Sequence, residues 1–244
     1  MVILLLVIIL FSVFMINGII EDISVRNQVE EFKSRGVYLD KSGSTKYFTV
    51  KAREGENTTR HIKDGISDYN VGSKADIYVT SRNPLGDSAL IGWISKKTWI
   101  GHTALVYDDY GKKTIEITGS LSPEDNVVRI FPNTWISNAG QTPQVALLRI
   151  KDTTEKERQR IIEYAEKQMG KPYNYSFLFN RNNSFYCSDL VSRAVASVGI
   201  NVNYDYLATT GSDMIVSPNT YLIYYQETII IDGVVTHEVY YLVE

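Results

Sequence analysis

The chain has 244 residues, 44% of them hydrophobic and 22% charged, and its formal net charge is −3. This balance is ordinary for a globular protein, and since no run of basic residues stands out, we expect no nucleic acid partner. The single cysteine excludes a disulfide bond within the chain. The length allows one large domain or two small ones.

The first 20 residues differ from the rest. Residues 2–16 contain one polar side chain, Ser12. With residues 17–20 the apolar stretch reaches about the 20 residues that a membrane-spanning helix needs. No small-residue cleavage site stands out near Gly18, so we expect residues 1–20 to be a retained transmembrane anchor rather than a cleaved signal segment. The flanking charges give almost no orientation signal. Because an N-terminal hydrophobic segment usually directs export of the chain behind it, we expect the remainder outside the cytoplasm.

Residues 21–73 are expected to form a stalk and an N-terminal extension. Residues 23–33 predict a short polar helix with one apolar side, and residues 46–52 alternate like a β-strand. Residues 53–64 are charged and lack apolar periodicity, which predicts a loop. His61 lies in this loop and is expected to be solvated.

From residue 74 to residue 244 we expect a single domain, and its first half is rich in short β-strands. Alternating apolar residues predict strands at 76–80, 89–94, 101–107, 114–118, 127–131 and 145–150. The polar residues 108–113 predict a turn. Strands 101–107 and 114–118 are therefore expected to form a hairpin.

Two helices are predicted after these strands. Thr154 and Glu157 fit a capping box at the start of the first helix, which ends near Gly170. The second helix contains apolar residues at helical spacing after Cys187, with Ser184 as its expected N-cap. This assignment puts Cys187 in the first turn of the helix.

The C-terminal part begins with residues 204–218, which show no regular pattern. Strands are predicted at residues 221–225 and 228–243. Asp232-Gly233 stands between two β-branched runs, which is typical of a hairpin turn.

A cysteine in the first turn of a helix has a reason to be reactive. The unpaired N–H groups and the helix dipole favour an anion there, so the thiolate is stabilised. Taken alone, a single cysteine is more often an inert buried side chain. Cys187 is a candidate nucleophile if the chain also supplies a base and a group that orients the base.

His102 and Glu116 are the candidates for that pair. If paired residue numbers in the hairpin add to an even number, both side chains lie on the same face of the sheet, close enough for the carboxylate to hold the imidazole. The alternative is that Glu116 faces solvent on a half-buried strand. His237 lacks such an arrangement, because Glu238 follows it directly and points to the opposite face.

Other chemistries have little support in the sequence. It contains no CxxC or HExxH motif, no histidine pair at ligand spacing and no phosphate-binding glycine loop. It also lacks the GxSxG motif of a serine nucleophile. We therefore expect neither a metal nor a cofactor.

Together, these segments resemble the circularly permuted branch of the NlpC/P60 papain-like superfamily, the YiiX/YebB-like cysteine hydrolases. The similarity spans about residues 74–225. The chain departs from the family pattern at Ala75, where the family tends to have glycine, and at Gly101, where serine often precedes the histidine. The matching motifs occur in the order of that branch: Ala75-Asp76-Ile77, Gly101-His102-Thr103-Ala104-Leu105-Val106, Ile115-Glu116, Gly170-Lys171-Pro172-Tyr173-Asn174 and Tyr186-Cys187-Ser188-Asp189-Leu190-Val191.

The resemblance implies an α+β, papain-like fold, in which an antiparallel sheet or barrel packs against helices. It also implies roles for individual residues. Cys187 would be the nucleophile, His102 the base and Glu116 the residue that orients the base. Tyr173 would be a candidate donor to the oxyanion.

We therefore expect a membrane-anchored thiol hydrolase that cleaves an amide bond. Peptidoglycan peptide is the first candidate substrate, because the unpermuted members of the superfamily suggest it. One alternative keeps the same triad but acts as a hydrolase or acyltransferase on an acyl lipid, as relatives similar to lecithin:retinol acyltransferase do. A second alternative is a non-catalytic binding module, and the intact His, Glu and Cys set argues against it.

Overall fold

The computed structural model describes most of the chain. The described residues are 2–81, 99, 101–119, 122, 124–137, 144–177, 181–205, 208–231 and 233–244. The strand expected at residues 89–94 lies outside them, and so do the side chains of residues 2–15.

The described strands form one nine-stranded sheet in the order β1-β2-β9-β8-β7-β3-β4-β5-β6. All neighbours pair antiparallel except β2 and β9, which are parallel. The expectation of an antiparallel sheet or barrel is therefore corrected to a mixed sheet. The strands are β1 (Gly36–Ser42), β2 (Thr45–Lys51), β3 (Ile77–Thr80), β4 (Thr103–Val106), β5 (Lys113–Glu116), β6 (Arg129–Pro132), β7 (Gln144–Ile150), β8 (Thr220–Ile231) and β9 (Val234–Val243).

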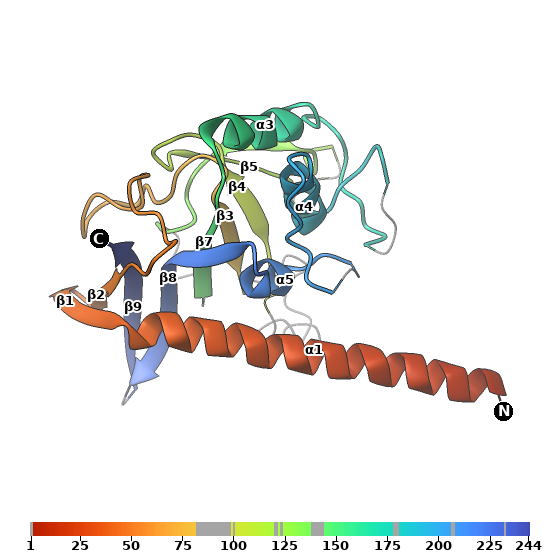
Figure 1. The fold of residues 1–244 in the computed structure, drawn as a ribbon, viewed down its shortest axis with the longest axis horizontal. Helices are drawn as coiled ribbons and strands as arrows, with labels where there is room; N and C mark the ends of the chain where they lie inside the picture. Colours follow the sequence, from red (N-terminus) through yellow and green to blue (C-terminus); the bar gives the residue numbers. More distant parts are fainter. Residues whose placement is uncertain are drawn as a thin grey trace.

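Helices lie on both sides of the strands. The described helices are α1 (Val2–Ser34), α3 (Glu155–Glu166), α4 (Cys187–Ala196) and α5 (Gly211–Val216). Figure 1 shows α3 and α4 on one side and α1 along the opposite side. The short helix α5 contacts both α1 and β8, and α4 contacts β4 and β5. These contacts position the start of α4 beside the β4–β5 hairpin.

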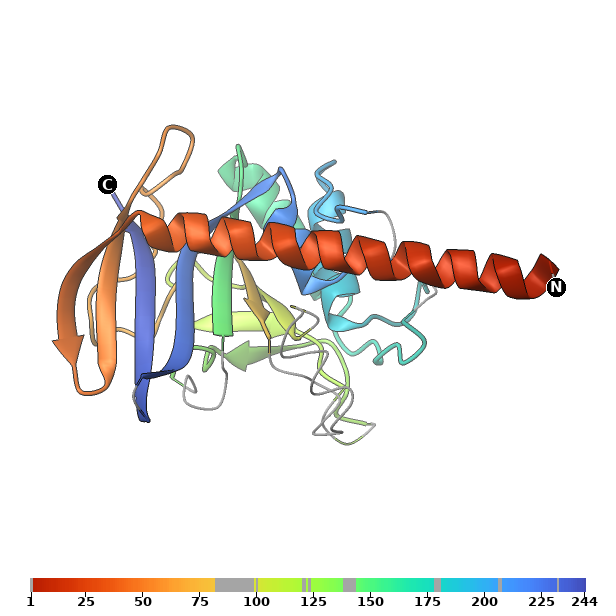
Figure 2. The ribbon, with the colours of Figure 1, turned by 90° about the horizontal axis from the view of Figure 1, so that it is seen from below.

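Helix α1 is longer than the predicted segment 23–33. Its side chains Val25, Val29 and Phe32, spaced four and three residues apart, are buried in the core. The expected stalk region 21–73 thus contains packed residues, and β1 and β2 within it extend the sheet. Figure 2 shows α1 crossing the strands, with its N-terminal end projecting past them. In the described part of the chain, no helix combines the length and apolar character needed to cross a membrane.

The β4–β5 hairpin has the predicted register. Leu105 pairs with Ile115 and Val106 pairs with Thr114, so the paired numbers add to an even number. All four of these side chains are fully buried. Burial of each large aliphatic side chain contributes about 1.5–3 kcal/mol, and a slip of one residue would disrupt the packing on both buried faces.

The start of α4 was predicted incorrectly. Tyr186, not Ser184, is the N-cap, and its side chain makes no capping hydrogen bond. The chain stays extended up to this point because Phe185 forms a parallel β-bridge with Tyr173. Cys187 is consequently the first residue of the helix, so its predicted place in the first turn is confirmed.

The C-terminal region holds a second difference. Residues 204–218 were expected to be irregular, but they include α5, which a capping box of Thr210 and Asp213 initiates. Strand β8 joins the predicted strand 221–225 to the first part of the predicted segment 228–243, and β9 forms the rest of that segment. The predicted hairpin turn is borne out, because Ile231 pairs with Val234 and Gly233 has φ +78°. Residue 232 itself lies outside the described residues.

A buried ion pair fastens the long loop before β3 to the sheet. The side chains of Arg149 and Asp76 are 1% and 0% exposed, and they form two hydrogen bonds of 3.0 and 2.8 Å. Arg149 also donates to the carbonyl oxygens of Asn57 and His61, at 2.7 and 2.8 Å. Ala75 precedes this aspartate with φ +66°, a left-handed conformation that favours glycine.

Candidate active site

Three neighbouring elements bring the predicted site residues together. Cys187 is the first residue of α4, His102 directly precedes β4, and Glu116 ends β5. The Cys187 sulfur lies 3.9 Å from the carbonyl oxygen of Gly101, the residue before the histidine. The thiol is 6% exposed, so it lies at the bottom of its site rather than on the surface.

The two ring nitrogens of His102 face different partners. Nε2 is hydrogen-bonded to Oε2 of Glu116. Nδ1 is buried and has no hydrogen-bond partner among the described residues, and the ring interacts electrostatically with the Cys187 thiol. The imidazole is therefore held by the carboxylate and is coupled to the thiol, as a base and its orienting group require.

Glu116 is held in place by two further donors. Its Oε1 accepts a hydrogen bond from Thr114 Oγ1 at 2.6 Å and one from Trp135 Nε1 at 3.4 Å. The residue is 8% exposed, so the expectation of a solvent-facing carboxylate is excluded. With both oxygens engaged, the carboxylate has little freedom to turn away from the imidazole.

The electrostatics favour a thiolate beside an imidazolium. Burial opposes the charged forms of His102 and Cys187. The hydrogen bonds and charges of Cys187 and Glu116 outweigh it at the histidine and raise the pKa of His102 to about 10. At the cysteine, His102 and the backbone N–H groups of Thr103 and Ser188 outweigh burial and lower the pKa of the thiol. Glu116 keeps a lowered pKa, despite burial, because of the charge of His102.

Trp135 is a site residue that sequence reasoning missed. Its ring stacks on His102, with centroids 5.2 Å apart and planes at 14°. Its other neighbour is Tyr78, stacked at 5.0 Å and 23°. No sequence motif links Trp135 to the histidine. Trp135 follows β6, and the contact arises because β6 lies next to β5 in the sheet. The indole covers the imidazole and helps to fix the plane of the ring.

Comparison with known proteins agrees with this geometry. A family described as permuted papain-like amidase enzymes, YaeF/YiiX, C92 family, matches residues 77–229, more than half of the chain. The chain belongs to this family. The C92 family is one of papain-like cysteine amidases, which makes the protein a thiol hydrolase of amide bonds.

Comparisons with solved structures and with curated proteins add little to the family match. Among solved structures, the chain is similar to YiiX from Escherichia coli O157:H7, a protein described as a metalloprotein. The two share 16% identity with a TM-score of 0.47, over 62% of this chain and 96% of that chain. No curated protein matches the sequence.

Tyr173, the candidate oxyanion donor of this C92 member, lies close to the nucleophile. Burial, together with the nearby Cys187 charge, raises the pKa of its hydroxyl, so the group keeps its proton. A Cβ added at Gly119 would come within 3.0 Å of the Tyr173 ring, so a glycine at that position makes room for the ring. A protonated hydroxyl beside the thiol can donate a hydrogen bond to an oxyanion.

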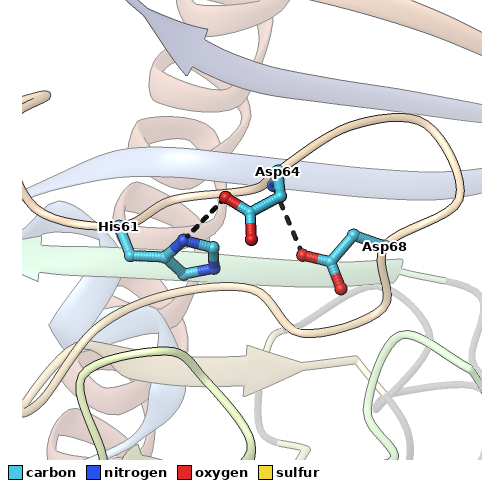
Figure 3. A group of neighbouring side chains, drawn as sticks. All are labelled: His61, Asp64 and Asp68. Carbon is cyan, nitrogen blue, oxygen red and sulfur yellow. Dashed lines mark hydrogen bonds and ion pairs between the residues drawn. The ribbon is translucent and has the colours of Figure 1, made fainter.

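The other two histidines lie elsewhere. His237 is in β9, separated from β4 by β8, β7 and β3, and its Nδ1 is hydrogen-bonded to Thr228 at 2.9 Å. His61 is partly buried, not solvated as expected, and Figure 3 shows it beside Asp64 and Asp68. One potential ligand atom from each of these three residues lies within 4.8 Å of the others.

The three residues also have bonding partners that need no ion. His61 Nε2 is hydrogen-bonded to the carbonyl oxygen of Asn70, and Nδ1 lies 3.3 Å from Asp64. The Lys63 ammonium binds the carbonyl oxygen of Asp68 and lies near both carboxylates, while burial lowers its pKa to about 8. These contacts order the loop before β3, and the lysine balances part of the negative charge.

The Glu116→Gln variant tests the electrostatic coupling in the C92 site. The amide keeps the shape but loses the charge that stabilises the imidazolium, so the pKa of His102 falls and that of Cys187 rises. We expect alkylation of Cys187 by iodoacetamide to slow at pH values below the pKa of the variant thiol, by up to about tenfold for each unit by which that pKa rises. In rate–pH profiles the acid-side fall in rate should move to higher pH. Glu238→Gln on β9 is the matched control, and equal profiles for the two variants would contradict the coupling.

Proposed function

We propose that Cys187, His102 and Glu116 form the catalytic triad of this amidase. The observation that carries the proposal is the histidine ring, which is hydrogen-bonded to a carboxylate and lies near enough to the thiol to lower its pKa. The thiolate is favoured before substrate arrives, because the imidazolium and the first turn of α4 both stabilise negative charge on sulfur.

The reaction follows from these positions. The Cys187 thiolate attacks the carbonyl carbon of the amide, forming a C–S bond and a tetrahedral oxyanion. The backbone N–H of Cys187 and the hydroxyl of Tyr173 are the proposed donors to that oxyanion. His102 gives its proton to the leaving amine as the C–N bond breaks and a thioester remains. Water then attacks the thioester while His102 accepts its proton, which releases the acid and restores the thiolate.

For the substrate we propose a peptide of the cell wall, cleaved outside the cytoplasm by a protein attached to a membrane through its N-terminal segment. The apolar composition of residues 1–20 supports the attachment. Exposed isoleucines also occur on the part of α1 whose side chains the structure describes. They are Ile16, Ile19, Ile20 and Ile23, each more than half exposed. Four exposed isoleucines within eight residues of one helix are suited to an apolar environment.

The same isoleucines favour a second candidate, an acyl lipid ester or amide, because attachment would hold the active site near lipid. Both candidates use the same thiol chemistry and differ in the group attached to the acyl carbon. A single assay can therefore separate them.

The assay incubates the full chain with purified peptidoglycan and, separately, with phosphatidylcholine vesicles that contain an N-acyl lipid. New amino groups released from peptidoglycan, and absent with Cys187→Ala, would support the proposal. Fatty acid release that depends on Cys187 would favour the lipid instead, and no Cys187-dependent product from either would count against both. The vesicle sample also tests attachment, because an attached chain floats with the vesicles and an unattached one does not.

A further inference from the structure

A cavity lies along the loop segments that precede the proposed nucleophile in the chain. Its volume is about 820 Å³, and two loop segments, residues 172–176 and 181–184, line it. These segments lie beside α4 (Figure 1). Tyr173, whose hydroxyl interacts electrostatically with Cys187, forms part of the wall, and Ser184 stands three residues before the nucleophile. A volume of this size is in the range of cavities that bind small ligands.

The lining carries several polar side chains and a positive charge. Its side chains are mostly hydroxyl and amide groups together with two tyrosine rings, and Arg181 is its one charged member among the described residues. None of the described carboxylates pairs with the Arg181 guanidinium. The lining contains no carboxylate of its own.

Two neighbouring cations, Lys171 and Arg193, contact the loop segment 181–184. Lys171 donates to the carbonyl oxygen of Asn182 at 3.1 Å and to Gln168 Oε1 at 2.7 Å, so its ammonium lies behind the wall without a carboxylate among those partners. Arg193 donates to the carbonyl oxygen of Arg181 at 2.8 Å. Its own charge is balanced by Asp189, at 2.7 Å. The Arg181 backbone is thereby held in place while its side chain remains available.

The aromatic part of the lining is also ordered. The Tyr175 hydroxyl accepts a hydrogen bond of 2.6 Å from Asn126 Nδ2. The Tyr175 ring packs against Tyr173, with centroids 4.9 Å apart. The aromatic wall therefore has a fixed orientation beside a single guanidinium, a combination suited to a peptide group with a carboxylate near it.

From this arrangement we infer that the cavity binds the carboxylate-bearing part of an acidic peptide and that Arg181 selects for that carboxylate. The inference rests on the thiol hydrolase function proposed above and deepens it by naming the substrate class. An acyl lipid substrate is the competing class, which the experiment distinguishes.

Three affinity reagents test the inference on the full chain. Bromoacetyl-dialanine with a free C-terminal carboxylate is compared with the same reagent ending in a carboxamide and with bromoacetyl-decylamide. Each alkylates Cys187 by forming an S–C bond and releasing bromide, and mass spectrometry gives the rate. We expect the carboxylate reagent to react about fivefold faster than the carboxamide, the effect of one partly exposed ion pair. This preference should shrink in 1 M salt.

Variants of Arg181 test whether this side chain causes the preference for the carboxylate reagent. Arg181→Gln should bring the carboxylate-to-carboxamide ratio close to one, and Arg181→Lys should retain part of it. Arg160→Gln, which removes an exposed arginine from α3, should keep the wild-type ratio. A wild-type ratio of one or less, a ratio that Arg181→Gln leaves unchanged, or fastest labelling by the decylamide would each overturn the inference.

Iodoacetamide separates this inference from the proposed function. It is small and neutral, so it reports the reactivity of the thiolate alone. If iodoacetamide labels Cys187 of the wild type rapidly but the peptide reagents show no preference, the substrate class is wrong and the thiol chemistry stands. If iodoacetamide fails to label Cys187, the proposed function is overturned together with the inference.

Discussion

Replacing His102 by alanine is expected to lower kcat/KM for amide hydrolysis by a factor on the order of 10³–10⁴. Two losses combine in this variant. The leaving amine no longer receives a proton from the imidazolium, and the Cys187 thiolate loses the positive charge that lowers its pKa. The measurement is kcat/KM on a peptide amide, together with the rate of thiol alkylation at pH 7.

The matched control is His237→Ala. That histidine lies in strand β9 and, like His102, forms a side-chain hydrogen bond, but three strands separate β9 from β4. We expect its activity to stay within about twofold of wild type, since surface substitutions away from a site have small effects. Similar losses in the two variants, or full activity in His102→Ala, would remove the histidine from the mechanism.

Replacing Arg149 by methionine is expected to cost about 3–5 kcal/mol of unfolding free energy, the usual penalty for removing one partner of a buried ion pair. Methionine preserves much of the length but leaves Asp76 with the single Arg60 bond of 3.1 Å as its side-chain ion pair. The carbonyl oxygens of Asn57 and His61 lose their donor as well. Urea unfolding gives the free energy and also the slope, which reports whether the unfolding remains two-state.

Arg158→Met is the control for this stability prediction. Arg158 pairs with Glu155 at 2.6 Å, but that glutamate is 63% exposed, so the pair is worth less than about 1 kcal/mol. If Arg149→Met is no more destabilised than Arg158→Met, the buried cluster is not what holds the loop before β3.

Local rules predicted the parts of the site that depend on short stretches of chain. His102 and Glu116 could be placed on one face because side chains alternate along paired strands and the turn between them is short. Cys187 could be placed in the first turn of a helix because apolar residues recur after it at helical spacing. The error at Ser184 was also local, since no pattern in the sequence signals the β-bridge between Phe185 and Tyr173 that keeps this segment extended.

Contacts between distant segments could not be predicted in this way. Trp135 contacts His102 because of the order of strands β4, β5 and β6. The spacing of apolar residues within one strand does not reveal which strands are neighbours. The exposure of Arg181 beside the cavity likewise depends on how two loop segments meet. The resemblance to a family supplied the roles of the three reacting groups, and its motifs include neither Trp135 nor Arg181.

The parallel pairing of β2 with β9 joins Thr45 to His237 and Lys51 to Val243. During synthesis on the ribosome, β1 and β2 emerge well before β9 and have no neighbour on one edge until β9 has been made. Such a distant pairing slows folding, because the intervening chain must be ordered first. An early stop codon before β9 would therefore leave the first hairpin of the nascent polypeptide without its partner strand, as a target for quality-control proteases.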